Sequence, residues 1–241
     1  MTWSIVARDK SGAFGVAIAS RFFAVGALCP HARSGVGALS TQALMNPLLP
    51  APALSGLALQ REPSDLLAEL LAQDPGRAHR QFHMIDAQGR AAAHTGESCI
   101  DWCGHAIDVN FSIAGNMLAG PQVIAATADS FRKNEQLPFA ERLIRAMAAG
   151  EAAGGDKRGK QAAALLIYNG QDYAALDLRV DDHPDPLVEL QRLYDVSLER
   201  FQPFVACLAT RENPGGILDR QQIEAEIGRF HAARQVGGKP Q

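Results

Sequence analysis

The sequence has few cysteines and no cluster of charge of one sign. Only four cysteines occur in 241 residues, too few for a disulfide scaffold and typical of free thiols in a reducing compartment. The 23 basic and 26 acidic residues give a net charge of −3 without long runs of either sign. Because binding to a phosphate backbone or an anionic membrane requires clustered Lys and Arg, we expect neither nucleic acid nor membrane as a partner. The charge balance favours a small molecule or a peptide.

Targeting signals and cofactor motifs are also missing. The opening segment MTWSIVARDK has no charged start followed by an apolar core, and no uncharged stretch is long enough to cross a bilayer. We therefore expect a cytoplasmic protein. No Gly-x-Ser-x-Gly, dinucleotide-binding or His-Glu-x-x-His motif occurs, and we predict no cofactor and no bound metal.

Apolar segments around turn residues predict three antiparallel hairpins. The paired segments are WSIVAR with AFGVAIAS, RQFHMID with RAAAHTG, and QAAALLIYN with YAALDLRV. Strands are also predicted for FFAVGAL, GVGALS and DVNFSIAG. Residues 45–56 contain three prolines and are predicted to be a connection, since proline disfavours both strands and helix interiors.

Helices are predicted where apolar residues recur on one face. The segments are 63–73, 120–134, 138–149, a long helix that begins at Asp185-Pro186, and 219–234. Groups of strands alternate with groups of helices, an order that two packed antiparallel sheets with helices outside would satisfy, giving an α+β fold. We expect a single domain over residues 1–235 and a flexible tail over 236–241. The small-residue strands and apolar helices favour a homo-oligomer.

Several blocks of the sequence resemble one family. The blocks are residues 1–44, HTGESCIDWCGH, IAGNML, GGDKRGKQAAALL and LRVDDHPDPLVEL, and they cover most of the chain up to about residue 193. In this order they resemble the domain-of-unknown-function 1028 family. The resemblance implies a four-layer αββα sandwich similar to the N-terminal-nucleophile hydrolases. It brings no agreed activity.

Thr2 is the candidate catalytic residue that this resemblance suggests. In N-terminal-nucleophile enzymes the first mature Thr, Ser or Cys attacks an amide while its own α-amine accepts the proton. An α-amine titrates at about 7.7–8.0 and is a usable base near neutral pH. Threonine is small enough to permit removal of Met1, which would expose that amine. The alternative is that Thr2 is an ordinary residue after the initiator methionine.

Charged and amide side chains near predicted strand ends complete the candidate site. Arg21 follows the second strand, where a cation would depress the pKa of the amine and attract an anionic substrate group; the alternative is an ordinary surface arginine at a strand end. Asp156 and Arg158 lie in a glycine-rich turn, where Arg158 could clamp a carboxylate or the two could brace the loop. Three amide side chains could line the substrate site or stabilise an oxyanion, or simply brace turns; they are Gln42, Asn46 and Asn116.

Rival interpretations of the chemistry remain open. His94, Cys99, Cys103 and His105 lie within twelve residues and would serve a metal-dependent hydrolase, although alternation along strands would splay these ligands. The acidic segment 181–185 could gather a cation, but it is also a suitable helix cap. A third reading is a non-catalytic protein of the same fold that binds a small ligand or stabilises an assembly.

Overall fold

The computed structural model describes residues 2–237, and the side chains of residues 2–234. By contacts within the chain it forms two compact units, residues 1–191 and 192–241. Most of the predicted tail, from residue 238 on, lies outside the described residues, as does Met1. Residues 236 and 237 belong to a helix.

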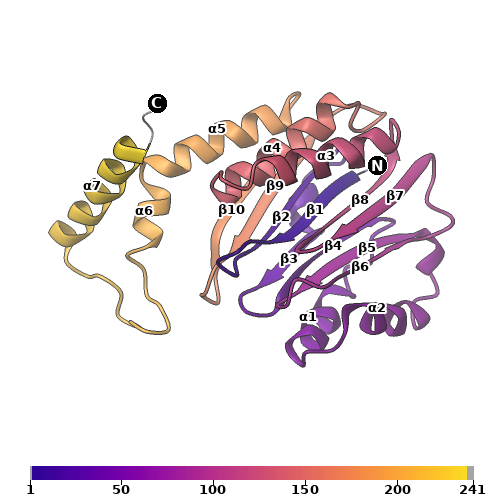
Figure 1. The fold of residues 1–241 in the computed structure, drawn as a ribbon, viewed down its shortest axis with the longest axis horizontal. Helices are drawn as coiled ribbons and strands as arrows, with labels where there is room; N and C mark the ends of the chain where they lie inside the picture. The colour runs from indigo at the N-terminus through magenta and orange to yellow at the C-terminus, as the bar shows by residue number, and fades with distance from the viewer. Residues whose placement is uncertain (1, 238–241) are drawn as a thin grey trace. The chain divides into compact units, whose positions relative to one another are not determined.

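The first unit contains a six-stranded sheet in which all neighbouring strands are antiparallel (Figure 1). The first two strands are joined by a turn at residues 9–13, where the Asp9 carboxylate accepts hydrogen bonds from the Ser11 and Ala13 amides. In sheet order the strands are β10 (Ala174–Val180), β9 (Ala162–Tyr168), β2 (Phe14–Ser20), β1 (Thr2–Arg8), β8 (Phe111–Leu118) and β7 (Trp102–Asp108).

A four-stranded antiparallel sheet packs against one face of the six-stranded sheet. Its strands are, in order, β3 (Pro30–Arg33), β4 (Gly37–Ala43), β5 (Arg80–Asp86) and β6 (Ala91–Thr95).

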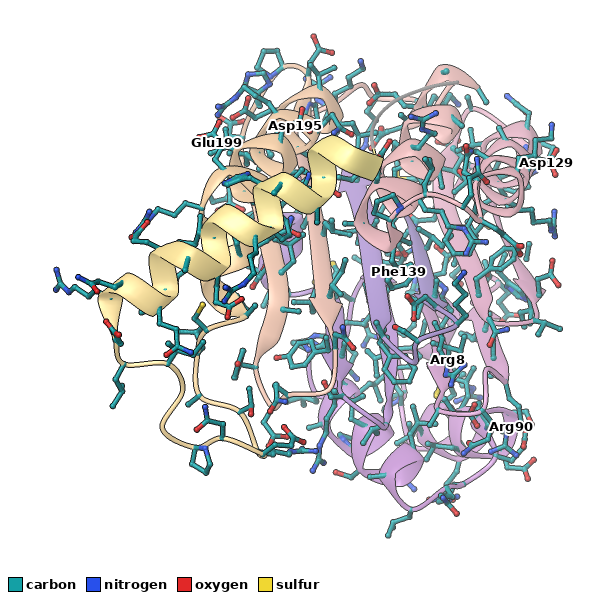
Figure 2. All side chains as sticks on the ribbon, turned by 60° about the vertical axis from the view of Figure 1, so that its left-hand side comes forward. Arg8, Arg90, Asp129, Phe139, Asp195 and Glu199 are labelled. Carbon is teal, nitrogen blue, oxygen red and sulfur yellow. The ribbon has the colours of Figure 1, made fainter. Side chains whose placement is uncertain are left out.

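Helices cover the outer face of each sheet (Figure 1). Helices α3 (Pro121–Lys133) and α4 (Phe139–Ala152) contact the six-stranded sheet, and α1 (Pro50–Ala58) and α2 (Pro63–Ala72) contact the four-stranded sheet. The side chains of this unit fill the spaces between the layers (Figure 2). The expected αββα sandwich of two antiparallel sheets is therefore confirmed.

The side chains of β1 alternate between the two faces of its sheet, so this strand packs against both the four-stranded sheet and the helices. Val6 belongs to an apolar cluster with Ile85 of β5, between the sheets. Trp3 faces the helices, where its ring lies close to Gly150 of α4. Glycine in β2 permits close packing of α4: a Cβ on Gly15 would lie 2.5 Å from the Leu143 side chain.

Two local predictions are wrong. Residues 45–56 are not all connection, because α1 begins at Pro50; proline is tolerated in the first turn, where the amide has no partner within the helix. FFAVGAL is not a strand. Ala24 is left-handed with φ 52°, residues Val25–Ala27 form a 3-10 turn, and the strand that pairs with β4 begins at Pro30.

The second unit consists of helical segments. Helix α5 (Pro186–Glu199) crosses the boundary between the units, and α6 (Phe201–Val205) and α7 (Arg220–Gly237) follow. Within this unit Arg200 pairs with Glu224 of α7, and His231 hydrogen-bonds the Glu199 carbonyl at 2.9 Å. No helix of the described residues combines the length and apolar character needed to cross a bilayer.

Candidate functional site

Thr2 lies at the start of β1, between two polar residues of the neighbouring strands. Ser20 of β2 and Asn116 of β8 are its register partners. The Thr2 Oγ1 and Ser20 Oγ atoms are 3.0 Å apart and hydrogen-bonded, and the Asn116 amide donates to the Thr2 carbonyl at 3.4 Å. Thr2 is only 6% exposed, so its hydroxyl is held in a fixed, largely desolvated position.

Two glutamines link this end of β1 to the four-stranded sheet. Gln81 Oε1 accepts hydrogen bonds from Asn116 Nδ2 at 2.9 Å and from Gln42 Nε2 at 2.8 Å. Gln42 Nε2 also donates to the Ala114 carbonyl at 3.1 Å. Because their amide hydrogens already have partners, Gln42 and Asn116 hold the two sheets in register beside Thr2.

A buried histidine continues this network away from Thr2. His83 of β5 contacts Ser4 Oγ at 2.8 Å and Ser112 Oγ at 3.1 Å, and Ser4 Oγ donates to Gln42 Oε1 at 2.7 Å. Burial, with a smaller contribution from the charge of His105, lowers the pKa of His83 to about 3. The ring is therefore neutral at physiological pH. It hydrogen-bonds serines of both β1 and β8, which ties the two sheets together.

Arg21, Asp156 and Arg158 form a brace that fixes the loop before β9 to the end of β2. The Asp156 carboxylate, 2% exposed, accepts from the backbone amides of Arg21 and Arg158, each at 2.8 Å. The Arg21 guanidinium in turn donates to the Arg158 carbonyl. The structure brings the three residues together next to Ser20, and the contacts of Asp156 and Arg158 are those of the bracing alternative.

Asn46 serves a different loop. Its amide donates to Asp74 Oδ2 at 3.1 Å and its Oδ1 accepts from the Leu48 amide at 3.0 Å. Asp74 also pairs with Arg80, which holds the pKa of Asp74 at about 2. These contacts stabilise the turn that leads into α1.

A small cavity of about 100 Å³ lies beside Ser20 and Asp156, lined also by Trp3, Lys160 and several glycines. Ligand pockets usually measure about 300–1,000 Å³, so this cavity holds only a small group. The buried indole Nε1 of Trp3 has no hydrogen-bond partner among the described residues.

No histidine or carboxylate among the described residues hydrogen-bonds the Thr2 hydroxyl. A reaction at this hydroxyl would therefore use the α-amine of Thr2 as its base, which requires removal of Met1. The geometry suits a nucleophile with an adjacent hydroxyl, Ser20, that could relay a proton or orient the attacking oxygen.

The proposed metal ligands point to separate partners. His94 hydrogen-bonds the Arg77 carbonyl at 2.9 Å, whereas His105 hydrogen-bonds Thr95 Oγ1 at 2.9 Å. The thiols of Cys99 and Cys103 contact backbone carbonyls at 3.6 Å. Across the described residues, no three His, Cys, Asp or Glu side chains are grouped to hold a metal ion.

Sequence reasoning missed Ser20, Gln81 and His83. The turn at residues 9–13 sets the β1–β2 register, and counting back from it places Ser20 opposite Thr2. In RQFHMID, Gln81 and His83 alternate with apolar Phe82 and Met84, which marks a strand face that is buried and polar.

Comparisons with known proteins agree with the fold. A crystal structure of a DUF1028-family protein from Silicibacter pomeroyi is similar, with a TM-score of 0.84, 30% sequence identity, and coverage of 91% of this chain and 96% of that one. No curated protein matches. Two Anbu (ancestral beta-subunit) structures are more distant, each with 13% identity and a TM-score of 0.39. The alignment with the protein from Yersinia bercovieri covers 81% of this chain and 94% of that chain. The alignment with the protein from Hyphomicrobium sp. strain MC1 covers 82% of this chain and 95% of that chain.

Residues 2–190 match the family of unknown function DUF1028. The last matched residue is one residue before the end of the first unit, Gln191. The αββα sandwich is thus the part of the chain that the family describes, and the protein belongs to the DUF1028 family.

Proposed function

We propose that the protein hydrolyses an amide or peptide bond of a small metabolite or peptide, as an N-terminal-nucleophile enzyme with Thr2 as nucleophile. The supporting observation is the position of Thr2. Its hydroxyl lies between the two sheets at the end of β1, hydrogen-bonded to Ser20 Oγ at 3.0 Å. The family resemblance, which implies such a fold, supports the same reading.

The reaction begins once Met1 has been removed and the α-amine of Thr2 is free. The Thr2 Oγ1 atom attacks the amide carbonyl carbon, and the α-amine takes the hydroxyl proton and gives it to the leaving amine. Water, deprotonated by the same amine, then hydrolyses the ester. Arg21 supplies positive charge at the end of β2, which favours a substrate with an anionic group.

The other residues proposed for the site position these groups. Asp156 fixes the Arg21 backbone and the Arg158 loop. Asn116 donates to the Thr2 carbonyl, and Gln42 donates to the Ala114 carbonyl of the neighbouring strand β8. Asn46 contributes at one remove, through the turn that follows β4. Neither a cofactor nor a metal takes part in this mechanism.

The test combines intact mass with a nucleophile probe. Protein purified from its native host should lack one methionine, and a β-lactone should add once to the wild type, at Thr2. We expect Thr2→Ser to keep the labelling and Thr2→Ala to abolish both labelling and hydrolysis across a panel of acyl-amide substrates. Retention of Met1, or unchanged turnover in Thr2→Ala, would contradict the proposal.

A second candidate is a non-catalytic protein of this fold that binds a small ligand or stabilises an assembly. Its support is that Arg21, Asp156 and Arg158 are bonded to one another and that Thr2 is almost fully buried. Retained Met1, together with an oligomer in sedimentation experiments or ligand binding without turnover, would favour it over hydrolysis.

A further inference from the structure

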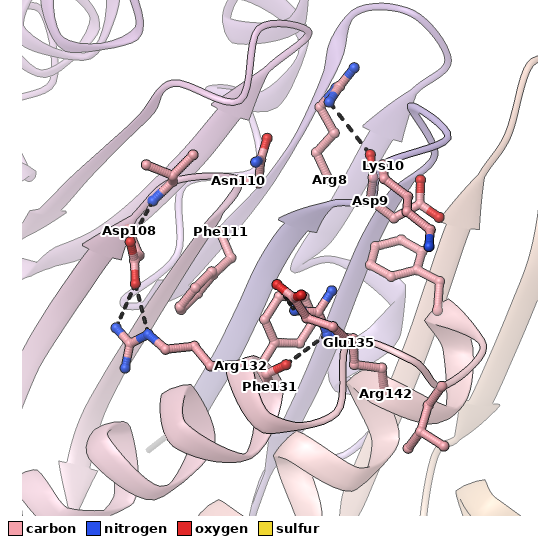
Figure 3. Close-up of a pocket in the computed structure, with 13 residues that line it drawn as sticks. Arg8, Asp9, Lys10, Asp108, Asn110, Phe111, Phe131, Arg132, Glu135 and Arg142 are labelled. Carbon is pink, nitrogen blue, oxygen red and sulfur yellow. Dashed lines mark hydrogen bonds and ion pairs between the residues drawn. The ribbon is translucent and has the colours of Figure 1, made fainter.

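A second, larger cavity lies at the opposite end of β1 from Thr2. Figure 3 shows the side chains that line it. Its volume is about 440 Å³, within the range of small-molecule sites. It is lined by the β1–β2 turn, the β7–β8 turn and the connection between α3 and α4. Thr2 and Arg8 are the two ends of β1, which places the cavity about 20 Å from Thr2. We call it the distal pocket.

Aromatic side chains form the apolar part of the distal pocket. The rings of Phe111 and Phe131 lie 5.0 Å apart in a tilted arrangement and, at 4% and 1% exposure, form the buried floor of the pocket, whereas the partly exposed Phe139 and Leu137 supply its accessible apolar surface. Such a surface favours a ligand with a flat, apolar body, because offset or tilted ring contacts add to the gain from burial.

Arg142 of α4 is held rigidly in this pocket. Its guanidinium stacks on the Phe131 ring, 3.6 Å from the centroid, and its Nε donates to the Phe131 carbonyl at 2.7 Å. The side chain is only 14% exposed, yet its nearest carboxylate oxygen, on Glu135, is 3.9 Å away, and Glu135 is 79% exposed. A half-buried guanidinium without a close counter-ion is a pre-arranged partner for an anion.

The other charges of the distal pocket leave this preference intact. Arg132 is paired with Asp108 at 2.6 Å. The Asp9 carboxylate accepts hydrogen bonds from Ser11 and Ala13 and keeps its negative charge. Burial outweighs the effect of this charge and of that on Glu135, both of which raise the pKa of Arg142. Arg8 extends away from the phenylalanines in Figure 3. Lys10, exposed at the rim, makes no ion pair with any described residue. Burial lowers the pKa of Arg142, as expected for a guanidinium short of compensating charge.

We propose that the distal pocket binds a small aromatic carboxylate, with the carboxylate on Arg142 and Lys10 and the ring against Phe139, above the buried Phe111 and Phe131. The assignment is independent of hydrolysis at Thr2. It follows from the combination of an aromatic wall with a fixed, incompletely paired guanidinium in a cavity of suitable size.

Calorimetric titration with 3-phenylpropionate tests this proposal. We expect saturable binding, with both 3-phenylpropanol, which lacks the charge, and acetate, which lacks the ring, bound at least about tenfold more weakly. Equal binding of the alcohol would overturn the role of the guanidinium, and equal binding of acetate that of the phenylalanines. Absence of saturable binding of 3-phenylpropionate would overturn the site.

Variants locate the ligand. Arg142→Gln should weaken binding by about tenfold to a hundredfold. The control is Arg145→Gln, three residues further along α4, where the arginine pairs with Glu141; this variant should leave binding unchanged. Glu135→Gln removes the competing carboxylate and should tighten binding several-fold, while Lys10→Gln weakens it. The last two residues are exposed, so these variants keep the test valid if Arg142→Gln does not fold. Identical affinities for wild type, Glu135→Gln and Lys10→Gln would overturn the proposal.

Discussion

The buried histidine of the inter-sheet network makes the stability of the first unit depend on pH. His83 is fully buried between Ser4 and Ser112, and burial lowers its pKa to about 3. In the unfolded chain a histidine titrates at about 6.5. Between these values the unfolded state binds a proton that the folded state does not, so stability falls as the pH falls below about 6.5.

The size of this effect follows from the shift. Each pH unit between the two pKa values costs about 1.4 kcal/mol, and the loss between about pH 6.5 and pH 5 comes to about 1.7 kcal/mol for this one group. His31 and His105, whose pKa values are also lowered by burial, add to the loss. Asp74, with a pKa of about 2, adds to the loss of stability mainly below about pH 4.

Urea unfolding at about pH 7, 6 and 5 measures how the free energy of unfolding depends on pH, provided the m-value is constant. Both tryptophans of the chain, Trp3 and Trp102, lie in the six-stranded sheet, so their fluorescence reports on the unit that contains His83. We expect His83→Gln to be less stable at neutral pH but to lose the His83 part of the pH slope. Ser112→Ala removes a partner of the ring without removing its titration, and should keep the slope. Equal slopes for wild type and His83→Gln would refute the reasoning.

Two further stability predictions concern packing and the loop brace. Gly15→Ala places a Cβ 2.5 Å from Leu143 and 2.8 Å from Phe139 and should lower the free energy of unfolding by about 1–3 kcal/mol. Gly228→Ala in α7 meets nothing within 4 Å and should stabilise its helix by about 0.5–1 kcal/mol. Calorimetric unfolding compares the two variants, and equal effects would contradict the packing argument. Asp156→Asn should destabilise the first unit by about 1–3 kcal/mol, because a buried carboxylate that accepts two backbone hydrogen bonds is replaced by an amide with one acceptor atom; an unchanged melting temperature would mean that the brace is dispensable.

The sequence predicts most of the layers because hairpins and amphipathic helices are local features. The turn dipeptide Asn169-Gly170 and the apolar segments on either side of it suffice to place β9 and β10. The errors occur where local rules allow two outcomes. Pro50 and Pro52 disrupt a helix interior but are tolerated in a first turn, and FFAVGAL has the composition of a strand although Ala24 adopts a left-handed conformation.

The residues around Thr2 depend on pairing between distant strands. Arg21, Asp156 and Arg158 were grouped by their positions at predicted strand ends, and they do meet. Their use as a brace, however, follows from the direction of individual hydrogen bonds. Gln81 meets Asn116 only because two sheets pack face to face in one register, and no local pattern specifies which polar residues of the two sheets will meet.

That register explains why so many polar side chains lie between the sheets near Thr2. At the other end of the interface, apolar residues such as Val6 and Ile85 pack without directional preference. The bonds of Ser4 to Gln42 and His83, and of Gln81 to Asn116, cross from one sheet to the other. A slip by one residue would break all of them and leave buried donors unsatisfied, at about 1–3 kcal/mol each. The network thus fixes the two sheets against each other at the end of β1 that carries Thr2.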